Sequence, residues 1–245
     1  MVTTLFELDL AVIVLVFGAM ALAGLVHGAL GLGFPMVATP IVAVTLDVRT
    51  AIILTLLPTI TVNIASIVGS QGYGESLRRY RALIGAVVVG SIVGAWILAS
   101  ADPSPFRLAL ALLVLLFLWT SHAQRLPREL FRAQPLAAML MLGVIAGISA
   151  GTTNVMVAVL IIYFLALDVA RSQMVPVLNT CFMIGKVAQV AILSLAGFVT
   201  LAAALETTPL AITALASLLV GQRLRDHIAV ETYRKLLHVL LAVCY

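Results

Sequence analysis

The chain has 245 residues, of which 63% are hydrophobic and 10% are charged, and its formal net charge is +4. Because soluble domains carry roughly 25% charged residues, this composition excludes a soluble globular protein and predicts an all-α integral membrane protein that crosses the bilayer several times. The positive charge lies in short loops between apolar segments, so no nucleic-acid partner is predicted. Cys181 and Cys244 lie in apolar runs and predict neither a disulfide nor a metal site.

Apolar segments follow one another along the whole chain. They lie at about residues 10–28, 34–46, 50–70, 82–99, 106–121, 135–150, 155–167, 173–197, 203–221 and 230–245. A helix needs about 20 residues to cross the hydrocarbon core of a bilayer. The segments that are short for this task are 34–46, 135–150, 155–167 and the last one.

Basic residues concentrate in particular loops, and the positive-inside rule places those loops in the cytoplasm. The basic loops are 71–81, 122–134 and 222–235. The N-terminus and the loops 101–105 and 198–204 are then outside. With this topology, segments 10–28 and 34–46 form a hairpin that returns to the outside, and segments 135–150 and 155–167 form a hairpin that opens to the cytoplasm.

This arrangement predicts an inverted-topology repeat, in which each half is a broken or re-entrant helix hairpin followed by three transmembrane helices. The predicted halves are residues 1–121 and 135–245, and residues 122–134 are a cytoplasmic linker. Related stretches support the repeat, because TLDVRTA at 45–51 resembles ALDVARS at 166–172 and both follow a short segment after a glycine-containing break.

The stretch GALGLGFPMVATP, residues 28–40, interrupts apolar sequence with three glycines and two prolines. Unpaired backbone in lipid costs several kcal/mol per group, so such a break must be buried in protein or line a cavity. A helix N-terminus there offers N–H donors and partial positive charge to an anion. We predict an anion cradle at Gly31, Gly33 and Phe34. The alternative is that the glycines only permit close helix packing and the prolines only a kink.

The corresponding stretch in the second half is GTTN, residues 151–154. Thr152, Thr153 and Asn154 carry the side chains that cap helix N-termini, so we predict that they cap the next helix and complete a second cradle. The spacing Gly28-x-x-Gly31-x-Gly33 does not match a dinucleotide-binding loop, and no cofactor is predicted.

Lys186 is the most informative single residue, because an ammonium near the bilayer centre costs roughly 2.5–3.5 kcal/mol. It lies about thirteen residues into its segment, or roughly 20 Å at 1.5 Å per residue. Asn179, Lys186 and Gln189 share one helical face and form a polar stripe. We predict that this stripe contacts the substrate. The alternatives are a lysine that reaches the membrane interface or pairs with Asp168.

Segment 50–70 offers an opposite wall, because Thr55, Thr59 and Asn63 share a face at intervals of four residues. Ordinary hydrogen bonding between helices explains these residues equally well. His27 precedes the first break, and imidazole titrates near neutral pH. His27 and Lys186 are therefore the candidates for carrying a coupling proton, although a plain buried histidine is an equal alternative for His27.

Residues 147–151, GISAG, match the G-x-S-x-G pattern of a serine hydrolase. In such a hydrolase the serine lies on a sharp turn, the nucleophile elbow, which needs a preceding strand and a positioned histidine. The flanks of Ser149 are instead membrane segments. An intramembrane serine hydrolase is therefore a minor alternative, and the protein is predicted not to be an enzyme.

Two pairs of stretches resemble the TauE/SafE sulfite exporter family over nearly the whole chain. The first pair is GALGLGFPMVATP followed by AIILTLLPTITVN, and the second is GISAGTTNVMVAVLIIYFLALD followed by VLNTCFMIGKVAQ. The resemblance implies a multi-pass carrier of the inner (plasma) membrane that exports sulfite or organosulfonates and is coupled to protons. Thr152, Thr153, Asn154 and Met156 stand where many members have glycines and a proline, which leaves the identity of the anion open.

The resulting hypothesis is a secondary transporter of a small sulfur-containing anion that works by alternating access. Its expected partners are that anion and the lipid bilayer, with a homo-oligomer as a possibility. A passive anion channel is the alternative function. The predicted substrate-binding residues are Gly31, Gly33, Phe34, Asn63, Thr152, Thr153, Asn154, Asn179, Lys186 and Gln189.

Overall fold

The structure is a computed structural model that describes residues 5, 8–68, 73–102, 105, 106, 108, 112 and 128–225. Every regular element of five or more residues in this part of the chain is an α-helix. The helices are α1 (Leu10–Leu30), α2 (Phe34–Ala43), α3 (Val48–Val68), α4 (Tyr73–Arg79), α5 (Arg81–Ser100), α7 (Arg128–Ala133), α8 (Pro135–Thr153), α9 (Met156–Ala166), α10 (Arg171–Leu195), α11 (Leu201–Glu206) and α12 (Thr208–Arg225). The predicted segment 230–245, nearly all of 106–121 and half of the linker 122–134 lie outside the described residues.

Long apolar helices confirm the prediction of a multi-pass membrane protein. Six stretches of the described chain are long and apolar enough to cross a bilayer, namely Leu10–Leu30, Val48–Val68, Arg81–Ser100, Pro135–Thr153, Arg171–Leu195 and Leu201–Leu224. The last one combines α11 and α12, which the sequence treated as one segment. The helix Phe34–Ala43 is apolar but has only 10 residues, too few to cross alone.

Both predicted breaks exist, but each is narrower than the sequence suggested. Helix α1 continues through Gly28 to Leu30, so the first break is confined to residues 31–33. Helix α8 continues through Thr153, so the second break is only Asn154 and Val155. The prediction that Thr152, Thr153 and Asn154 cap the next helix is therefore wrong, because Thr152 and Thr153 belong to the last turn of the preceding helix and Asn154 is its C-cap.

The breaks occur where the backbone turns into the left-handed region. Gly31 has φ +81° and Gly33 has φ +101°, values that glycine adopts without a steric cost. Asn154 has φ +66°, and asparagine is among the few other residues that tolerate this conformation. Pro35 lies in the first turn of α2, where a missing N–H costs nothing.

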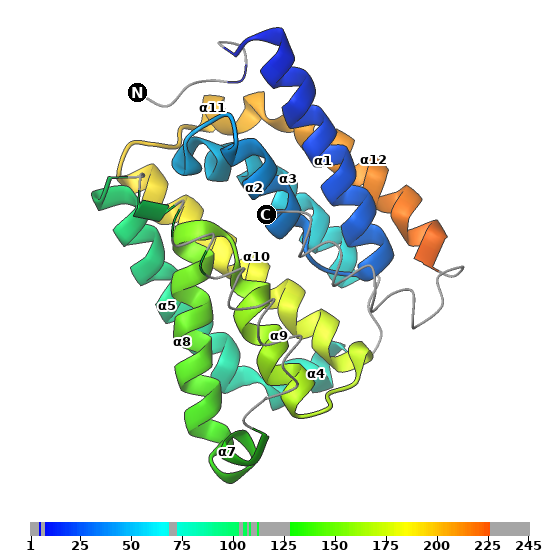
Figure 1. Cartoon of the computed structure of the whole chain (residues 1–245), viewed down its shortest axis with the longest axis vertical. Coiled ribbons are helices and arrows are strands. Elements are labelled where there is room, and N and C mark those ends of the chain that lie inside the picture. Colours follow the sequence, from blue (N-terminus) through cyan, green and yellow to red (C-terminus); the bar gives the residue numbers. More distant parts are fainter. Residues whose placement is uncertain are drawn as a thin grey trace.

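Helices α1 and α12 pack side by side, as do α5 and α8, and α10 crosses the molecule between the two pairs (Figure 1). Glycines make these contacts possible. A Cβ on Gly28 would overlap the backbone of α12 at Leu218 and Gly221, and a Cβ on Gly147 would overlap the backbone of α5 at Val87. Small residues that let helix backbones touch are typical of membrane helix packing.

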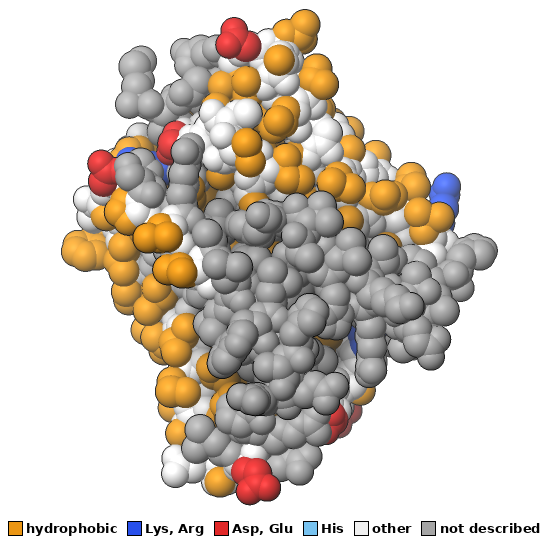
Figure 2. All heavy atoms as spheres, viewed as in Figure 1, with side chains coloured by type: hydrophobic (Ala, Val, Ile, Leu, Met, Phe, Trp, Pro, Cys, Tyr) orange, Lys and Arg blue, Asp and Glu red, His pale blue; other side chains and the backbone are white. Residues whose placement is uncertain are grey.

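Figure 2 shows hydrophobic side chains along the outer flanks formed by the two helix pairs. The exposed large residues on these helices include Val14, Leu22, Val89, Trp96, Leu140, Ile145, Ile212 and Leu219. In a soluble protein an apolar surface this extensive would favour aggregation, whereas in a bilayer it matches the lipid tails.

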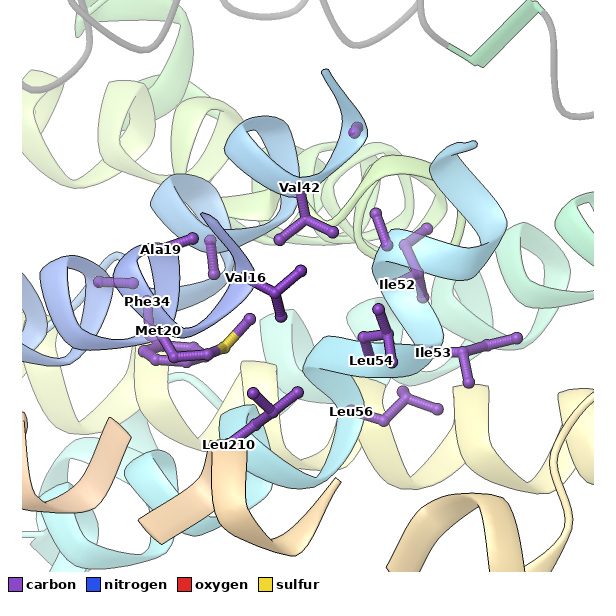
Figure 3. Packing of buried hydrophobic residues seen from close by; sticks show 14 of the residues in the cluster. Val16, Ala19, Met20, Phe34, Val42, Ile52, Ile53, Leu54, Leu56 and Leu210 are labelled. Atoms are coloured by element: carbon purple, nitrogen blue, oxygen red, sulfur yellow. The ribbon is translucent and has the colours of Figure 1, made fainter. Parts of the chain in front are cut away.

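The half-helix α2 is held inside the protein rather than at its surface. All of its residues except Ile41 are buried. Phe34, the first residue of α2, packs with Met20 of α1 and Leu210 of α12 in one apolar cluster (Figure 3). On the other side, Val42 faces the α3 residues Ile52 and Leu54 in the same apolar cluster (Figure 3). This packing buries the N-terminus of α2 near the break.

We expect Gly147→Val to destabilise the protein strongly, because the new side chain would push α8 away from α5. Overpacking a core typically costs about 1–3 kcal/mol, and contact with rigid backbone leaves less room for relaxation. Thermal unfolding in detergent measures the effect. Gly85→Val is the matched control, because Gly85 lies on the exposed face of α5 with open space around its Cα. Equal stability of the two variants would contradict the proposed packing role of Gly147.

Candidate functional site

The first break is paired by side chains from other helices. The C-terminal carbonyl of Leu30 accepts from Arg171 Nη2 at 2.9 Å. The Gly31 carbonyl accepts from Asn179 Nδ2 at 3.0 Å. At the other edge, the Phe34 N–H donates to His27 Nδ1 at 3.2 Å. Helix α10 therefore supplies two of the donors that compensate for the missing helical hydrogen bonds of α1.

His27 has one defined tautomer in this arrangement. A backbone N–H only donates, so Nδ1 of His27 must be an unprotonated acceptor. The ring proton is then on Nε2, which lies 2.9 Å from Ser66 Oγ of α3. His27 thus connects the start of α2 to α3. Protonation of Nδ1 would require the loss of its bond with Phe34.

The first turn of α2 is consequently paired within the protein. Besides the bond from Phe34, the N–H groups of Met36 and Val37 donate to the Gly33 carbonyl at 3.1 and 3.2 Å. The predicted anion cradle at Gly31, Gly33 and Phe34 stays a prediction. In this conformation an anion could take the Phe34 N–H only by displacing His27.

The second break carries the buried lysine. Lys186 Nζ donates to Asn154 Oδ1 and to Gln189 Oε1. Gln189 Nε2 in turn donates to the Gly151 carbonyl at 2.8 Å, in the last turn of α8. Lys186 is 3% exposed, and both of its partners are neutral. The predicted alternative of a lysine at the membrane interface is inconsistent with this burial.

Asn154 joins the two halves of the chain. Its Oδ1 accepts from Lys186 Nζ, which determines the orientation of the amide. Its Nδ2 therefore faces α2 and α3, donating to Thr39 Oγ1 at 2.8 Å and lying 3.4 Å from Thr55 Oγ1. Thr39 was missed in the sequence because a threonine within an apolar helix gives no signal until the partner helix is known.

The threonines before Asn154 have a different role from the predicted one. The hydroxyls of Thr152 and Thr153 donate to the carbonyls four residues earlier, at 2.8 and 3.0 Å. Ser149 behaves in the same way, donating to Ile145 at 2.9 Å within α8. Residues 147–151 are thus helical throughout and lack the strand-to-helix turn of a nucleophile elbow.

Between these two networks, several buried polar atoms have no partner in the described part of the chain. They are Thr59 Oγ1, both amide atoms of Asn63, and Asn179 Oδ1. Thr59, Asn63 and Asn179 are each 0% exposed. An unpaired polar atom in a protein interior costs about 1–3 kcal/mol, so a group of them needs an explanation.

The predicted site residues are thus assembled from α2, α3, α8 and α10. The structure places Asn179 against the first break, and Lys186 and Gln189 against the second. Asn63 lies one turn before Ser66, which contacts His27. Among the described residues, no group of three or more His, Cys, Asp or Glu side chains could hold a metal ion.

Comparison with known proteins identifies the family. The model of the family described as Sulfite exporter TauE/SafE matches residues 16–245. This match covers both breaks and all of the polar residues described above. No curated protein and no solved structure matched the chain.

Asn154 provides a test of the geometry at the second break. We expect Asn154→Gly and Asn154→Ala to remove the link to Lys186 equally, but only alanine must also adopt φ +66°. The left-handed conformation costs an alanine about 1–2 kcal/mol, so Asn154→Ala should be less stable than Asn154→Gly by about 1 kcal/mol. Unfolding midpoints in detergent measure the difference. A glycine variant that is the less stable of the two would show that this backbone turn is assigned incorrectly.

Proposed function

Because the chain belongs to the sulfite exporter TauE/SafE family, we propose that it is a secondary transporter that exports a small sulfur oxyanion across the inner membrane. Sulfite and organosulfonates are the proposed substrate class. The family match and the six candidate membrane spans support a multi-pass membrane transporter. Lys186 provides the main support for the proposed site, because a buried amino group with neutral partners becomes, once protonated, a local positive charge that an anion would bind.

The hydrogen bonds of Lys186 suggest how it would take part. A neutral amine has two N–H bonds, and the two amide acceptors use both. Protonation adds a third N–H and a positive charge, which the described protein atoms do not engage. We propose that this third donor binds an oxyanion and that Lys186 carries the coupling proton. Substrate and proton would then share one residue.

The proposed binding site lies between the two breaks. Lys186 would provide the counter-charge, and Asn63, Asn179 and Gln189 would orient the oxyanion by hydrogen bonds. The backbone at Gly31–Phe34 would contribute after His27 moves. Sulfur oxyanions present several acceptor oxygens, so a convergent set of donors of this kind suits them.

Alternating access is the proposed mechanism, and an inverted repeat would provide its geometry. The matched pairing of α1 with α12 and of α5 with α8 supports such a repeat, because each pair joins helices of opposite halves. An arginine follows each LDV stretch within two residues, and both arginines donate to the end of another helix. Arg171 donates to the end of α1 at Leu30, and Arg49 donates to the end of α5 at Leu98.

Ligand binding is the first test of this proposal. Thermal unfolding of the detergent-purified protein would be measured with sulfite, thiosulfate, sulfate, taurine, sulfoacetate and a carboxylate. A ligand that binds only the folded state stabilises it by RT ln(1 + [L]/Kd), or about 2.7 kcal/mol at 100 times Kd. A shift for one or more sulfur anions is expected. The absence of any such shift, or equal shifts for all the anions, would contradict the proposal.

We expect Lys186→Met to abolish proton-driven sulfite accumulation in proteoliposomes. Loss of a charged hydrogen-bond donor costs about 1.5–3 kcal/mol, which corresponds to roughly 10- to 100-fold weaker binding. Methionine keeps most of the side-chain volume, so the folded protein should remain. Val187→Ala is the control, because Val187 lies on the exposed face of the same helical turn.

The same assay separates a carrier from a channel. A carrier coupled to protons should accumulate sulfite against its gradient when a pH gradient is imposed. Flux that only follows the sulfite gradient would favour a passive anion channel. Wild-type accumulation by Lys186→Met would remove Lys186 from the transport mechanism.

A further inference from the structure

Two polar stripes face each other in the middle of the molecule. Helix α3 carries Thr55, Thr59, Asn63 and Ser66 at intervals of three or four residues, which places them on one face. Helix α10 packs against α3 and carries Asn179, Lys186 and Gln189 on one face.

Contacts at both ends determine how the stripes are aligned. At one end, Thr55 lies beside Asn154, which binds Lys186. At the other end, Ser66 lies beside His27. The backbone carbonyl of His27 accepts from the Gly31 N–H, and the Gly31 carbonyl accepts from Asn179. The stripes therefore run antiparallel, with Thr59 and Asn63 between the two ends.

The polar groups at the two ends are paired apart from Asn179 Oδ1, whereas those of Thr59 and Asn63 between the ends are not. Lys186, Gln189 and Asn154 have protein partners, and so do His27 and Ser66. The unpaired atoms are Thr59 Oγ1, Asn63 Oδ1 and Nδ2, and Asn179 Oδ1. We call these three residues the unpaired layer. They account for four of the six buried side-chain atoms without a partner in the described part of the chain.

Thr59 differs from its neighbours in a way that points to a ligand. The hydroxyls of Thr55 and Thr61 donate to carbonyls of the preceding turn, at 3.0 and 2.9 Å. Thr59 makes no such bond, although the same carbonyl acceptors exist along the helix. Its hydroxyl is therefore free to donate to or accept from a bound molecule.

The chemistry of the unpaired layer is partly determined by what surrounds it. The Gly31 carbonyl only accepts, so the amide end of Asn179 that faces it must be the NH₂ group. The free end of Asn179 is then a carbonyl oxygen, which needs a donor. Asn63 adds one acceptor and one NH₂ group regardless of how its amide is oriented. The unpaired layer thus presents two carbonyl acceptors together with its donors.

We infer that the substrate is an anion that carries a hydrogen-bond donor as well as acceptor oxygens, and that the unpaired layer selects it. This inference rests on the proposed transport of a sulfur oxyanion. A fully deprotonated dianion such as sulfate or sulfite offers only acceptors, so even if Thr59 donated to one of the two buried carbonyl oxygens the other would stay unpaired. A protonated monoanion such as bisulfite, or a sulfonate with a hydroxyl or ammonium group, satisfies both kinds of partner.

The test compares two monoanions with the same head group. Ethanesulfonate and 2-hydroxyethanesulfonate differ by one hydroxyl, and both keep the same charge near neutral pH, so protonation of the protein cannot cause a difference between them. Binding to the purified protein would be measured by thermal shift at a series of concentrations. We expect the hydroxylated anion to bind about 10-fold more tightly or better, because a site built around a polar group rejects an analogue that lacks it.

Asn63→Leu is the decisive variant. The Asn63 side chain makes no hydrogen bond within the described part of the chain, so the substitution breaks none there. Replacing unpaired polar atoms by an apolar side chain of similar shape should leave the ligand-free protein as stable as before or more stable. The preference for 2-hydroxyethanesulfonate should fall to less than about 3-fold. Thr61→Val, on the same helix, should keep both the preference and the affinity of the wild-type protein.

The outcomes distinguish this inference from the function on which it rests. If both sulfonates bind equally, or if Asn63→Leu keeps the preference, the inference is wrong while the transporter proposal stands. If neither sulfonate binds and no other sulfur anion shifts the unfolding temperature, the proposed function itself fails. A marked loss of ligand-free stability in Asn63→Leu would also overturn the inference, because it would show that Asn63 has a structural role.

Discussion

Pairing of backbone polar groups away from water is the constraint on which the rest of this structure depends. A helix that ends inside the membrane leaves carbonyl and N–H groups that neither lipid nor water can satisfy. In this protein, side chains of neighbouring helices satisfy several of them. Asn179 pairs with the Gly31 carbonyl, His27 pairs with the Phe34 N–H, and Gln189 pairs with the Gly151 carbonyl. The polar residues required to stabilise the two breaks are also the residues that form the candidate site.

This dual role explains why the polar residues lie where they do on α10. Asn179 and Gln189 are ten positions apart, and each contacts a different break. Lys186 lies between them, one turn from Gln189, and reaches Asn154 at the second break. A single helix thus contacts both interruptions. Its polar face lies opposite α3, and some donors and acceptors between these contacts have no partner in the described part of the chain.

Much of this arrangement could be predicted from the sequence, because it follows from composition and periodicity. The long apolar helices, the two breaks and the stripe of Asn179, Lys186 and Gln189 each have a local signature. The roles of Thr39, Thr152 and Thr153 could not be predicted, because a hydroxyl can bond to its own helix or to another one with little change in sequence pattern. The extent of each break was also misjudged, since Gly28 and Gly151 pack helices together rather than interrupt them.

The glycine contacts have a consequence for how the molecule can deform. Where α1 meets α12 and α5 meets α8, backbone touches backbone, so sliding along the axis would force carbonyl groups into the opposing chain. We therefore expect the two helices of each pair to move together as one rigid unit. Between α3 and α10, by contrast, Thr59 Oγ1, the amide of Asn63 and Asn179 Oδ1 have no hydrogen bond in the described part of the chain, so no bond of these atoms opposes a change in the spacing of the two helices. We therefore expect the described helices to shift more easily between α3 and α10 than within the two glycine-packed pairs.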